Sequence, residues 1–529
     1  MSFTTLAFPV FVAIVVLLYY CLPHKWQWAV LLSASYLFYV MVDYRYVAFL
    51  LLTTITVYIT AMWLTKKNQE IKQLSQKMKG ENKELIKKEQ NKLKACRKRG
   101  LICCLLVNLA ILAVLKYINF VIGNINAVFS FAGSEAEISY IDILLPLGIS
   151  FYTFQAIGYL LDVYWKRVEA EKHFGKMALF LTFFPQLGQG PISRFGDLRK
   201  TLYGEHSFDK EQFLFGVQRI LWGYFKKLVI ADRIIIAVQT IVQDSEYYTG
   251  AYMFLGMMFY AVELYADFSG GIDITIGVAQ LFGVKLTENF ERPFFSKSIK
   301  EYWRRWHITM GTWFRDYVFY PFSISKPLKK LTVFVKKHFG AKASKRVAIY
   351  LATIILWIAT GIWHGADWNF VMWGLMNGVI ILISEELEPL YGKFHARFPK
   401  LSKAGWYRGF QVIRTFLLMS CLRIFDNYSC GEAFTSFGRM FTEWNALPIS
   451  IEELTGLGLD VTDYIIVIVG VCVMFAVSMI QRRGSVRVQI ASKPYIVQYV
   501  VYTALFFSIV LFGIYGMGYE KSMFIYNQF

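Results

Sequence analysis

Charged side chains are scarce in this chain of 529 residues. They make up 18% of it, whereas soluble domains average about 25%. Hydrophobic residues reach 56%, and this proportion excludes a disordered chain, a collagen-like fibre and a small disulfide-stapled scaffold. It also disfavours an ordinary soluble enzyme, because one water-soluble core cannot hide so many apolar residues. The composition therefore predicts a polytopic membrane protein.

The chain also lacks the common patterns of metal and serine chemistry. None of its seven cysteines stands in a Cys-x-x-Cys pair, so we expect buried thiols and no metal site. A Gly-x-Ser-x-Gly elbow is absent, which leaves a covalent serine mechanism without support. No inverted repeat is visible, and this disfavours a transporter or flippase. A structural scaffold for envelope synthesis is the other non-enzymatic alternative.

Basic residues gather between the apolar runs and give a net charge of +19. Residues 66–99 hold thirteen Lys or Arg and four Glu, and residues 326–346 hold eight Lys or Arg and no acid. This pattern is typical of cytoplasmic loops. Aromatic residues lie inside the apolar runs, so we expect no nucleic acid as a partner. Residues 66–99 form either a charged helical hairpin at the cytoplasmic surface or a solvated topogenic loop.

The apolar runs predict an all-α polytopic fold with roughly eleven to fourteen membrane helices and re-entrant segments. Arg482, Arg483, Arg487 and Lys493 follow the penultimate run without any acid, which places that loop in the cytoplasm. Residues 519–529 are then expected on the outer side of the cell membrane. The predicted spans are 6–22, 28–42, 46–64, 101–120, 143–164, 213–242, 252–268, 272–282, 347–363, 368–384, 410–424, 464–480 and 497–518.

Polar residues at membrane depth are costly and therefore mark candidate functional sites. Residues 183–195 contain two Pro and two Gly, which predicts either a re-entrant loop along a polar tunnel or an interfacial turn. Residues 267–322 contain Trp306 and His307 among charged neighbours, a pattern that also fits an interfacial amphipathic helix. His364 lies between two glycines at 361 and 365, where it can serve as a general base or cap a helix end.

Five segments between residues 145 and 385 resemble the membrane-bound O-acyltransferase superfamily, in the branch of alginate O-acetyltransferase and teichoic-acid D-alanyl transfer proteins. They read FFPQLGQGPISRF, SGGIDITIGVAQLFGV, ENFERPFF, WRRWHITMGTWFRDYVFYP and GIWHGADWNFVMWG. The resemblance implies a ring of helices around a thin central tunnel. It also implies acyl transfer from a cytoplasmic thioester, with His364 as the catalytic residue and His307 near the same tunnel. FSGGID and PQLGQGP depart from the commoner family pattern and leave the acyl group open.

The chain ends in Phe524, Tyr526 and Phe529 at F-x-Y-x-x-F spacing. This ending resembles the terminal motif of the small partner protein of teichoic-acid D-alanylation, whose tyrosine is implicated as an acyl carrier. The resemblance implies that Tyr526 receives the acyl group, with His364 as base. A separate outer-surface transferase of the SGNH type would then pass the group to a polysaccharide. The alternative is an aromatic anchor at the membrane interface.

Together these features predict an O-acyltransferase that acylates a cell-envelope polysaccharide, with acetyl as the first choice and D-alanyl transfer to teichoic acid as the second. Direct acylation of a lipid or glycan is a further alternative. We expect acetyl-CoA or an acyl-carrier protein as the donor substrate and no permanently bound cofactor. The predicted segments are N-terminal helices in 1–140, the catalytic core in 141–390, C-terminal helices in 391–518 and the tail. The candidate residues are His364, His307 and Tyr526, with Gln186, Gln189, Pro191, Arg194, Asp267, Ser269, Asp273, Asn289, Arg304, Arg305, Trp306, Trp363 and Asp367 along the tunnel.

Overall fold

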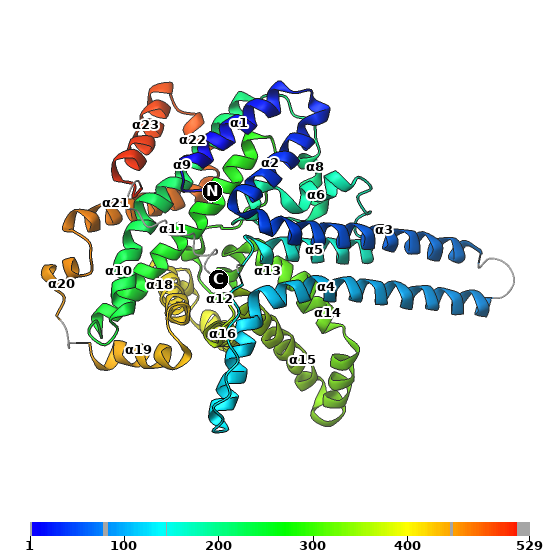
Figure 1. Ribbon diagram of the computed structural model, residues 1–529. Coiled ribbons are helices and arrows are strands. Elements are labelled where there is room, and N and C mark those ends of the chain that lie inside the picture. Colours follow the sequence, from blue (N-terminus) through cyan, green and yellow to red (C-terminus); the bar gives the residue numbers. More distant parts are fainter. Residues whose placement is uncertain (1–2, 78–82, 144, 445–447, 516–529) are drawn as a thin grey trace. The chain divides into compact units, whose positions relative to one another are not determined.

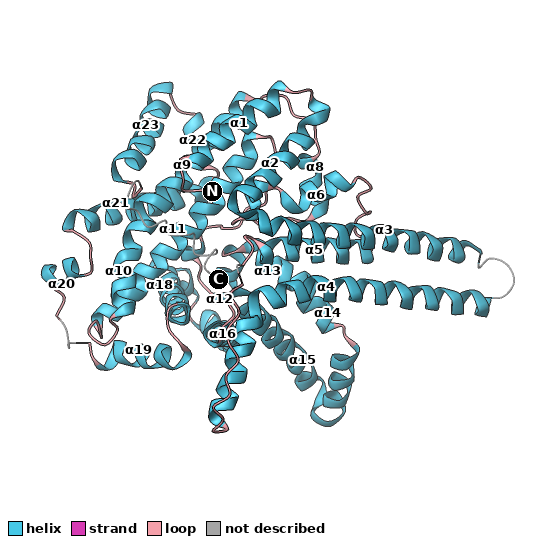
Figure 2. Cartoon of the chain, in the orientation of Figure 1, coloured by secondary structure: helices cyan, strands magenta, loops and turns pink. Residues whose placement is uncertain are grey.

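The computed structural model describes residues 3–77, 83–143, 145–444 and 448–515. Every regular element in these ranges is helical, and no strand occurs among them (Figure 2). Six helical segments are long and apolar enough to cross a membrane. The all-α membrane fold is thus confirmed. The larger number of spans and the ring around a tunnel stay predictions.

Two compact units make up the chain, and each is described by itself. Unit 1 comprises Met1–Leu214 and Val278–Leu286, and unit 2 comprises Phe215–Gly277 and Thr287–Phe529. The boundary between the units falls inside the segment that the sequence assigns to catalysis. The predicted division into N-terminal helices, catalytic core, C-terminal helices and tail is not tested by this boundary and stays a prediction.

Unit 1 begins with α1 (Ala7–Cys21), α2 (Gln27–Asp43), α3 (Val47–Lys77) and α4 (Lys83–Phe131). Helices α3 and α4 run side by side (Figure 1). Gln90 Nε2 of α4 donates a hydrogen bond to Ser75 Oγ of α3 at 2.9 Å. The basic segment 66–99 is therefore a helical pair in its described part. Its helix-forming Lys, Glu, Gln and Leu residues extend both apolar spans without a break.

The rest of unit 1 surrounds the Pro- and Gly-rich segment. Helix α5 (Ile149–Tyr164) is buried along nearly its whole circumference, as is α6 (Phe174–Thr182). A helix that is apolar and buried all round belongs to a core or a membrane bundle. The four-residue α7 (Phe184–Leu187) and an irregular segment then lead to α8 (Phe195–Leu202).

In unit 2, α9 (Lys210–Tyr224), a π-helical segment (Phe225–Ala231) and α10 (Asp232–Gln243) follow one another without a break. Helix α11 (Ala251–Leu281) is continuous, so the prediction of two spans at 252–268 and 272–282 is wrong. The glycines between them serve close packing. A Cβ on Gly270 would lie 2.9 Å from the carbonyl oxygen of Gly223, and a Cβ on Gly223 would lie 2.6 Å from that of Gly270.

A second correction concerns the basic segment 326–346. It belongs to α15 (Lys326–His364), which begins with Ser325 as N-cap and Pro327 in the first turn, both favourable helix starts. At Gly340, with φ 86° and ψ 169°, the chain turns sharply between two helical parts of α15. The Ser344 hydroxyl donates to the carbonyl oxygen of Thr332 at 2.8 Å across this turn. Lys and Ala are good helix formers, so the basic segment is helical on both sides of Gly340.

The remaining elements of unit 2 are all helical. Short helices lead into α15, and α16 packs directly against it. The elements are α12 (Ile299–Arg305), α13 (Ile308–Phe314), a second π-helical segment (Arg315–Phe319), α14 (Tyr320–Ser323), α16 (Trp368–Arg397), α17 (Pro399–Lys403), α18 (Gly405–Leu422), a 3-10 turn (Arg423–Asp426), α19 (Cys430–Thr442), α20 (Ile451–Gly456), α21 (Val461–Ile480), α22 (Val486–Ala491) and α23 (Tyr495–Phe512).

Candidate functional site

His364 is the last residue of α15, and its side chain is buried where α15 meets α16. Two glycines permit that close approach. A Cβ on Gly361 would lie 2.3 Å from the carbonyl oxygen of Phe370, and a Cβ on Gly374 would lie 2.3 Å from that of Trp357. The imidazole stands edge-on to the indole of Trp373 at 4.7 Å between ring centroids. Backbone contact between the two helices thus sets the position of the ring.

His307 lies between α12 and α13 with a left-handed backbone, at φ 46°, and is fully buried. Its Nδ1 is 3.2 Å from Oδ1 of Asn289. That oxygen also accepts hydrogen bonds from the Thr309 amide at 3.0 Å and hydroxyl at 2.9 Å. Because the amide proton of Thr309 requires an acceptor, Nδ1 of His307 must be the donor. The lone pair of the neutral ring then lies on Nε2.

The two histidines share a set of aromatic neighbours. Phe268 stands edge-on to His307 at 4.8 Å and also lines a small cavity beside His364. Trp363 is 5.9 Å from His307 and 5.0 Å from His364, between ring centroids. The cavity has a volume of about 20 Å³, enough for one water molecule. A thioester and a hydroxyl can meet there only after side chains move aside.

Arg423 and Asp426 complete this cavity and were missed from the sequence. The guanidinium donates to Asp426 Oδ2 at 3.1 Å, and the hydroxyl of Tyr260 donates to the same oxygen at 3.3 Å. Arg423 also faces the rings of Trp306 and Trp373, each 5.1 Å away. The available signal was an Arg and an Asp three residues apart at the end of an apolar run, which marks a functional candidate.

Burial and the nearby Arg423 hold His307 in its neutral form. They lower the pKa of His307 from 6.5 to about 3, with burial the larger cause. A neutral imidazole at every physiological pH can accept a proton and cannot serve as a permanent cation. The cation that lines the cavity is Arg423, and Asp426 balances its charge.

Three other predicted residues belong to a network of buried ion pairs in unit 2. Lys227 forms ion pairs with Asp232, at 2.8 Å, and with Asp267. Lys226 Nζ donates to Ser269 at 2.8 Å and to Asp273 at 2.6 Å. Both lysines stand on the π-helical segment, an element that recurs at functional sites. Buried charges persist only when they are paired. The lysine partners therefore explain why the predicted residues Asp267 and Asp273 can be buried, and Ser269 accepts from the same Lys226.

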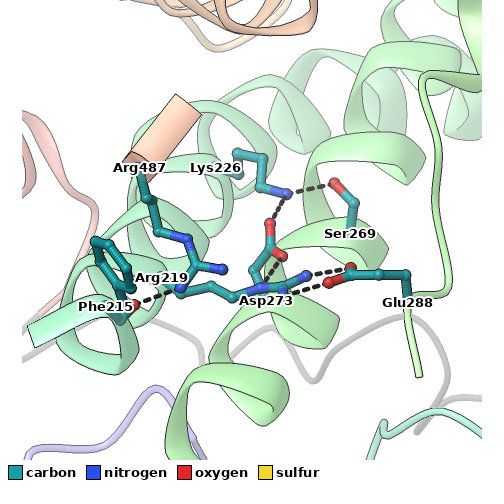
Figure 3. A network of polar contacts seen from close by, with 7 residues as sticks. All are labelled: Phe215, Arg219, Lys226, Ser269, Asp273, Glu288 and Arg487. Carbon is teal, nitrogen blue, oxygen red and sulfur yellow. Dashed lines mark hydrogen bonds and ion pairs between the residues drawn. The ribbon is translucent and has the colours of Figure 1, made fainter. Parts of the chain in front are cut away.

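The same network continues to Arg219, which sequence reasoning did not single out. Its guanidinium donates to Asp273 at 2.8 Å and to Glu288 at 2.6 Å. Figure 3 shows Asp273 held between Lys226 and Arg219. The signal available in the sequence was the pair of lysines at 226 and 227, which interrupts the apolar run 213–242.

Of the predicted tunnel residues of unit 1, Gln186 belongs to a polar cluster with Gln155 and Ser193. Gln186 Nε2 donates to Gln155 Oε1 at 3.0 Å, and Ser193 Oγ donates to Gln186 Oε1 at 3.2 Å. Gln189 is 1% exposed, and within the described residues neither polar atom of its amide has a hydrogen-bond partner. Pro191 is buried and Arg194 is half-buried. Their place along a tunnel stays a prediction.

Three predicted residues of unit 2 lie away from the cavity of His364. Arg304 is exposed and donates to the carbonyl oxygen of Lys300 at 3.2 Å. Arg305 pairs with Glu301 at 2.6 Å. Asp367 caps α16 by accepting from the Trp368 amide at 2.5 Å.

Tyr526 lies outside the described residues, so its role stays a prediction. Among the residues that the structure does describe, no cluster of His, Cys, Asp and Glu could hold a metal ion.

Residues 172–431 match the model of the membrane-bound O-acyltransferase family. Over 66% of its length the chain is 32% identical to the probable alginate O-acetylase AlgI of Pseudomonas putida, and the alignment covers 67% of that protein. It is 28% identical to the peptidoglycan O-acetyltransferase of Helicobacter pylori, over 62% of this chain and 63% of the relative. It is 27% identical to the teichoic acid D-alanyltransferase of Bacillus subtilis, over 51% and 65%.

The chain thus spans about two thirds of the length of the curated relatives it matches. The matched region contains both buried histidines, the cavity beside His364 and the Arg423–Asp426 pair. The chain belongs to the membrane-bound O-acyltransferase family.

Proposed function

We propose that this protein transfers an acyl group, acetyl in the first instance, from a cytoplasmic thioester donor toward a hydroxyl of a cell-envelope polymer. One observation carries the proposal: two buried histidines and a buried arginine surround Phe268 beside a cavity, within the region that matches the family. Its relatives are named for acylating alginate, peptidoglycan and teichoic acid. The acceptor class is inferred from those names.

In the proposed reaction His364 removes the proton of the acceptor hydroxyl. The hydroxyl oxygen forms a bond with the thioester carbonyl carbon, the carbon–sulfur bond breaks, and the thiolate leaves with the proton. A well-placed base of this kind contributes about 10²–10⁴-fold to the rate. Arg423 lines the cavity and would donate hydrogen bonds to the thioester carbonyl oxygen, which becomes negative during the reaction. Such donors are most effective in a site that excludes water.

The carrier step is part of the proposal. Tyr526 would take the acyl group first, and an SGNH-type transferase on the outer surface would pass it to the polysaccharide. Direct transfer to the acceptor is the alternative, and D-alanyl is the alternative group. Acetyl-CoA and an acyl-carrier protein both remain candidate donors, because each is acidic and suits the basic loops.

The test compares His364→Ala with His338→Ala, an exposed histidine on the same helix. We expect His364→Ala to lower the ester content of the envelope polymers by about 100-fold or more, and His338→Ala to leave it unchanged. Mass spectrometry of the C-terminal peptide identifies the group by its mass on Tyr526. Full ester content in membranes that contain His364→Ala would contradict the proposal.

A further inference from the structure

A second cavity in unit 2, with a volume of about 1120 Å³, opens between α21 and α23. Both helices pack against the π-helical segment, where Val229, Met474 and Ile509 share one hydrophobic core. The groove between them has walls of apolar side chains. These are Ile465, Ile466, Val469, Val473 and Val477 on α21, and Val501, Leu505 and Phe512 on α23.

The length of this groove is that of a fatty-acyl chain. Its lining on α21 runs from Thr462 to Val477, a rise of about 22 Å at 1.5 Å per residue. The hydrocarbon core of a bilayer is about 30 Å thick, so one leaflet occupies about half of that. The apolar wall can therefore accommodate the whole tail of a lipid from one leaflet.

Arginines line one end of the same groove. Arg482 and Arg487 follow the C-terminus of α21, and Arg292 joins them from the loop after α11. Arg219 also lines the groove, but Asp273 and Glu288 neutralise its charge (Figure 3). Glu291 lines the groove as well and offsets one of the three remaining arginine charges. The end of the groove therefore keeps a smaller excess of positive charge, at the side that the sequence assigns to the cytoplasm.

The positive charges at this end repel one another. Burial, with smaller effects of Arg305 and Arg482, lowers the pKa of Arg292. Burial and Arg219 also lower that of Arg487. Arg292 has a left-handed backbone, at φ 50°, and its buried Nε has no hydrogen-bond acceptor among the described residues. An anion placed here would supply both the missing acceptor and the missing negative charge.

We propose that the groove binds an anionic phospholipid, with one acyl chain between α21 and α23 and its phosphate against Arg292, Arg482 and Arg487. This site is additional to the acyl-transfer site. A short-chain thioester such as acetyl-CoA would satisfy the arginines but has no long apolar chain to contact the walls between α21 and α23. A phospholipid satisfies both ends at once, because its tail buries apolar surface and its phosphate accepts from guanidinium groups.

The test uses native mass spectrometry of the full chain in detergent with three added probes: dioleoyl-phosphatidylglycerol, dioleoylglycerol and acetyl-CoA. Val473→Trp fills the groove, and Ile468→Trp places the same indole on α21 outside the lining. We expect Val473→Trp to weaken phosphatidylglycerol binding about tenfold or more, equivalent to about 1.4 kcal/mol. Ile468→Trp should bind as the unmodified chain does.

A second pair of variants tests the charged end. Arg482→Gln combined with Arg487→Gln should weaken the binding of phosphatidylglycerol about tenfold and leave the binding of dioleoylglycerol unchanged. Arg483→Gln lies outside the lining and should change the binding of neither lipid. Unchanged phosphatidylglycerol binding in all variants, or its displacement by acetyl-CoA, would overturn the proposal. A photoreactive phosphatidylglycerol on the unmodified chain should label peptides of α21 and α23. Uniform labelling of all apolar helices would overturn it without any variant.

Discussion

The guanidinium of Arg423 lies 3.1 Å from the carboxylate of Asp426, and both side chains are more than nine-tenths buried. Three tryptophans surround this pair: Trp303, Trp306 and Trp373 lie 5.1 to 5.9 Å from the guanidinium carbon. A buried ion pair is a weak source of net stability but fixes the geometry of what it contacts. It therefore holds the wall of the His364 cavity in one arrangement.

Removing one member of that pair is expected to be costly. Arg423→Ala leaves Asp426 buried without its cation, and such changes lower the free energy of unfolding by about 3–5 kcal/mol. The double variant Arg423→Met with Asp426→Leu should recover much of that stability but not the acyl transfer. Thermal unfolding in detergent and ester content of the polymers measure the two effects. Full transfer in the double variant would show that the pair serves stability alone.

The buried His307 should make stability depend on pH. Its pKa is about 3 in the folded chain and ordinarily 6.5, so the unfolded chain binds the proton first as the pH falls. The stability contributed by the neutral ring is complete above pH 6.5 and is lost between pH 6.5 and 3, by up to about 1.4 kcal/mol per pH unit. His307→Gln should make the unfolding temperature less dependent on pH within that window. His338→Gln should leave the slope as it is.

The contact between α15 and α16 should tolerate no added methyl group. Gly374→Ala would place a Cβ 2.3 Å from the carbonyl oxygen of Trp357 and force the helices apart, which displaces His364. We expect both lower stability and lost acyl transfer. Gly392→Ala is the matched control on α16, because nothing lies within 4 Å of its Cβ. It should stabilise the helix by about 0.5–1 kcal/mol. Equal behaviour of the two variants in unfolding and transfer assays would contradict this account.

Lys227 should matter far more than a surface lysine. Lys227→Met leaves Asp232 and Asp267 buried without their shared cation, a change that typically costs about 3–5 kcal/mol. Lys200→Met removes only an exposed pair with Asp197 and should stay within about 1 kcal/mol. Expression level and unfolding temperature of the two variants test the difference. A mild effect of Lys227→Met would mean that water reaches the two carboxylates.

Part of this site could be predicted from the sequence. Polar residues at membrane depth drew attention to His307 and His364, and the structure places their rings around Phe268 and Trp363. Arg423 was missed because the tryptophans around it, Trp303, Trp306 and Trp373, come from segments far from it in the chain. Pairing of that kind leaves no local pattern, whereas helix periodicity and hydropathy are local quantities.

The two fold errors have a common physical cause. The predicted spans were divided at the glycines of α11, and the basic start of α15 was predicted as a loop, although a packed glycine and a lysine are both compatible with a helix. Gly340, with its positive φ, does end the first part of α15. Gly223 and Gly270 are in contact, and such small residues let membrane helices approach closely. Hydropathy measures where a helix can enter a membrane. It does not measure where the helix ends.

Gly340 divides α15 mechanically. Its left-handed φ of 86° interrupts the hydrogen-bonded rod between the basic arm, Lys326–Phe339, and the apolar half that carries His364. A continuous helix transmits twist and axial load along its whole length, and a joint of this kind does not. The arm already folds back there, since the Ser344 hydroxyl donates to the carbonyl oxygen of Thr332 at 2.8 Å, so movement of the arm is separated from the part of the helix that positions the imidazole.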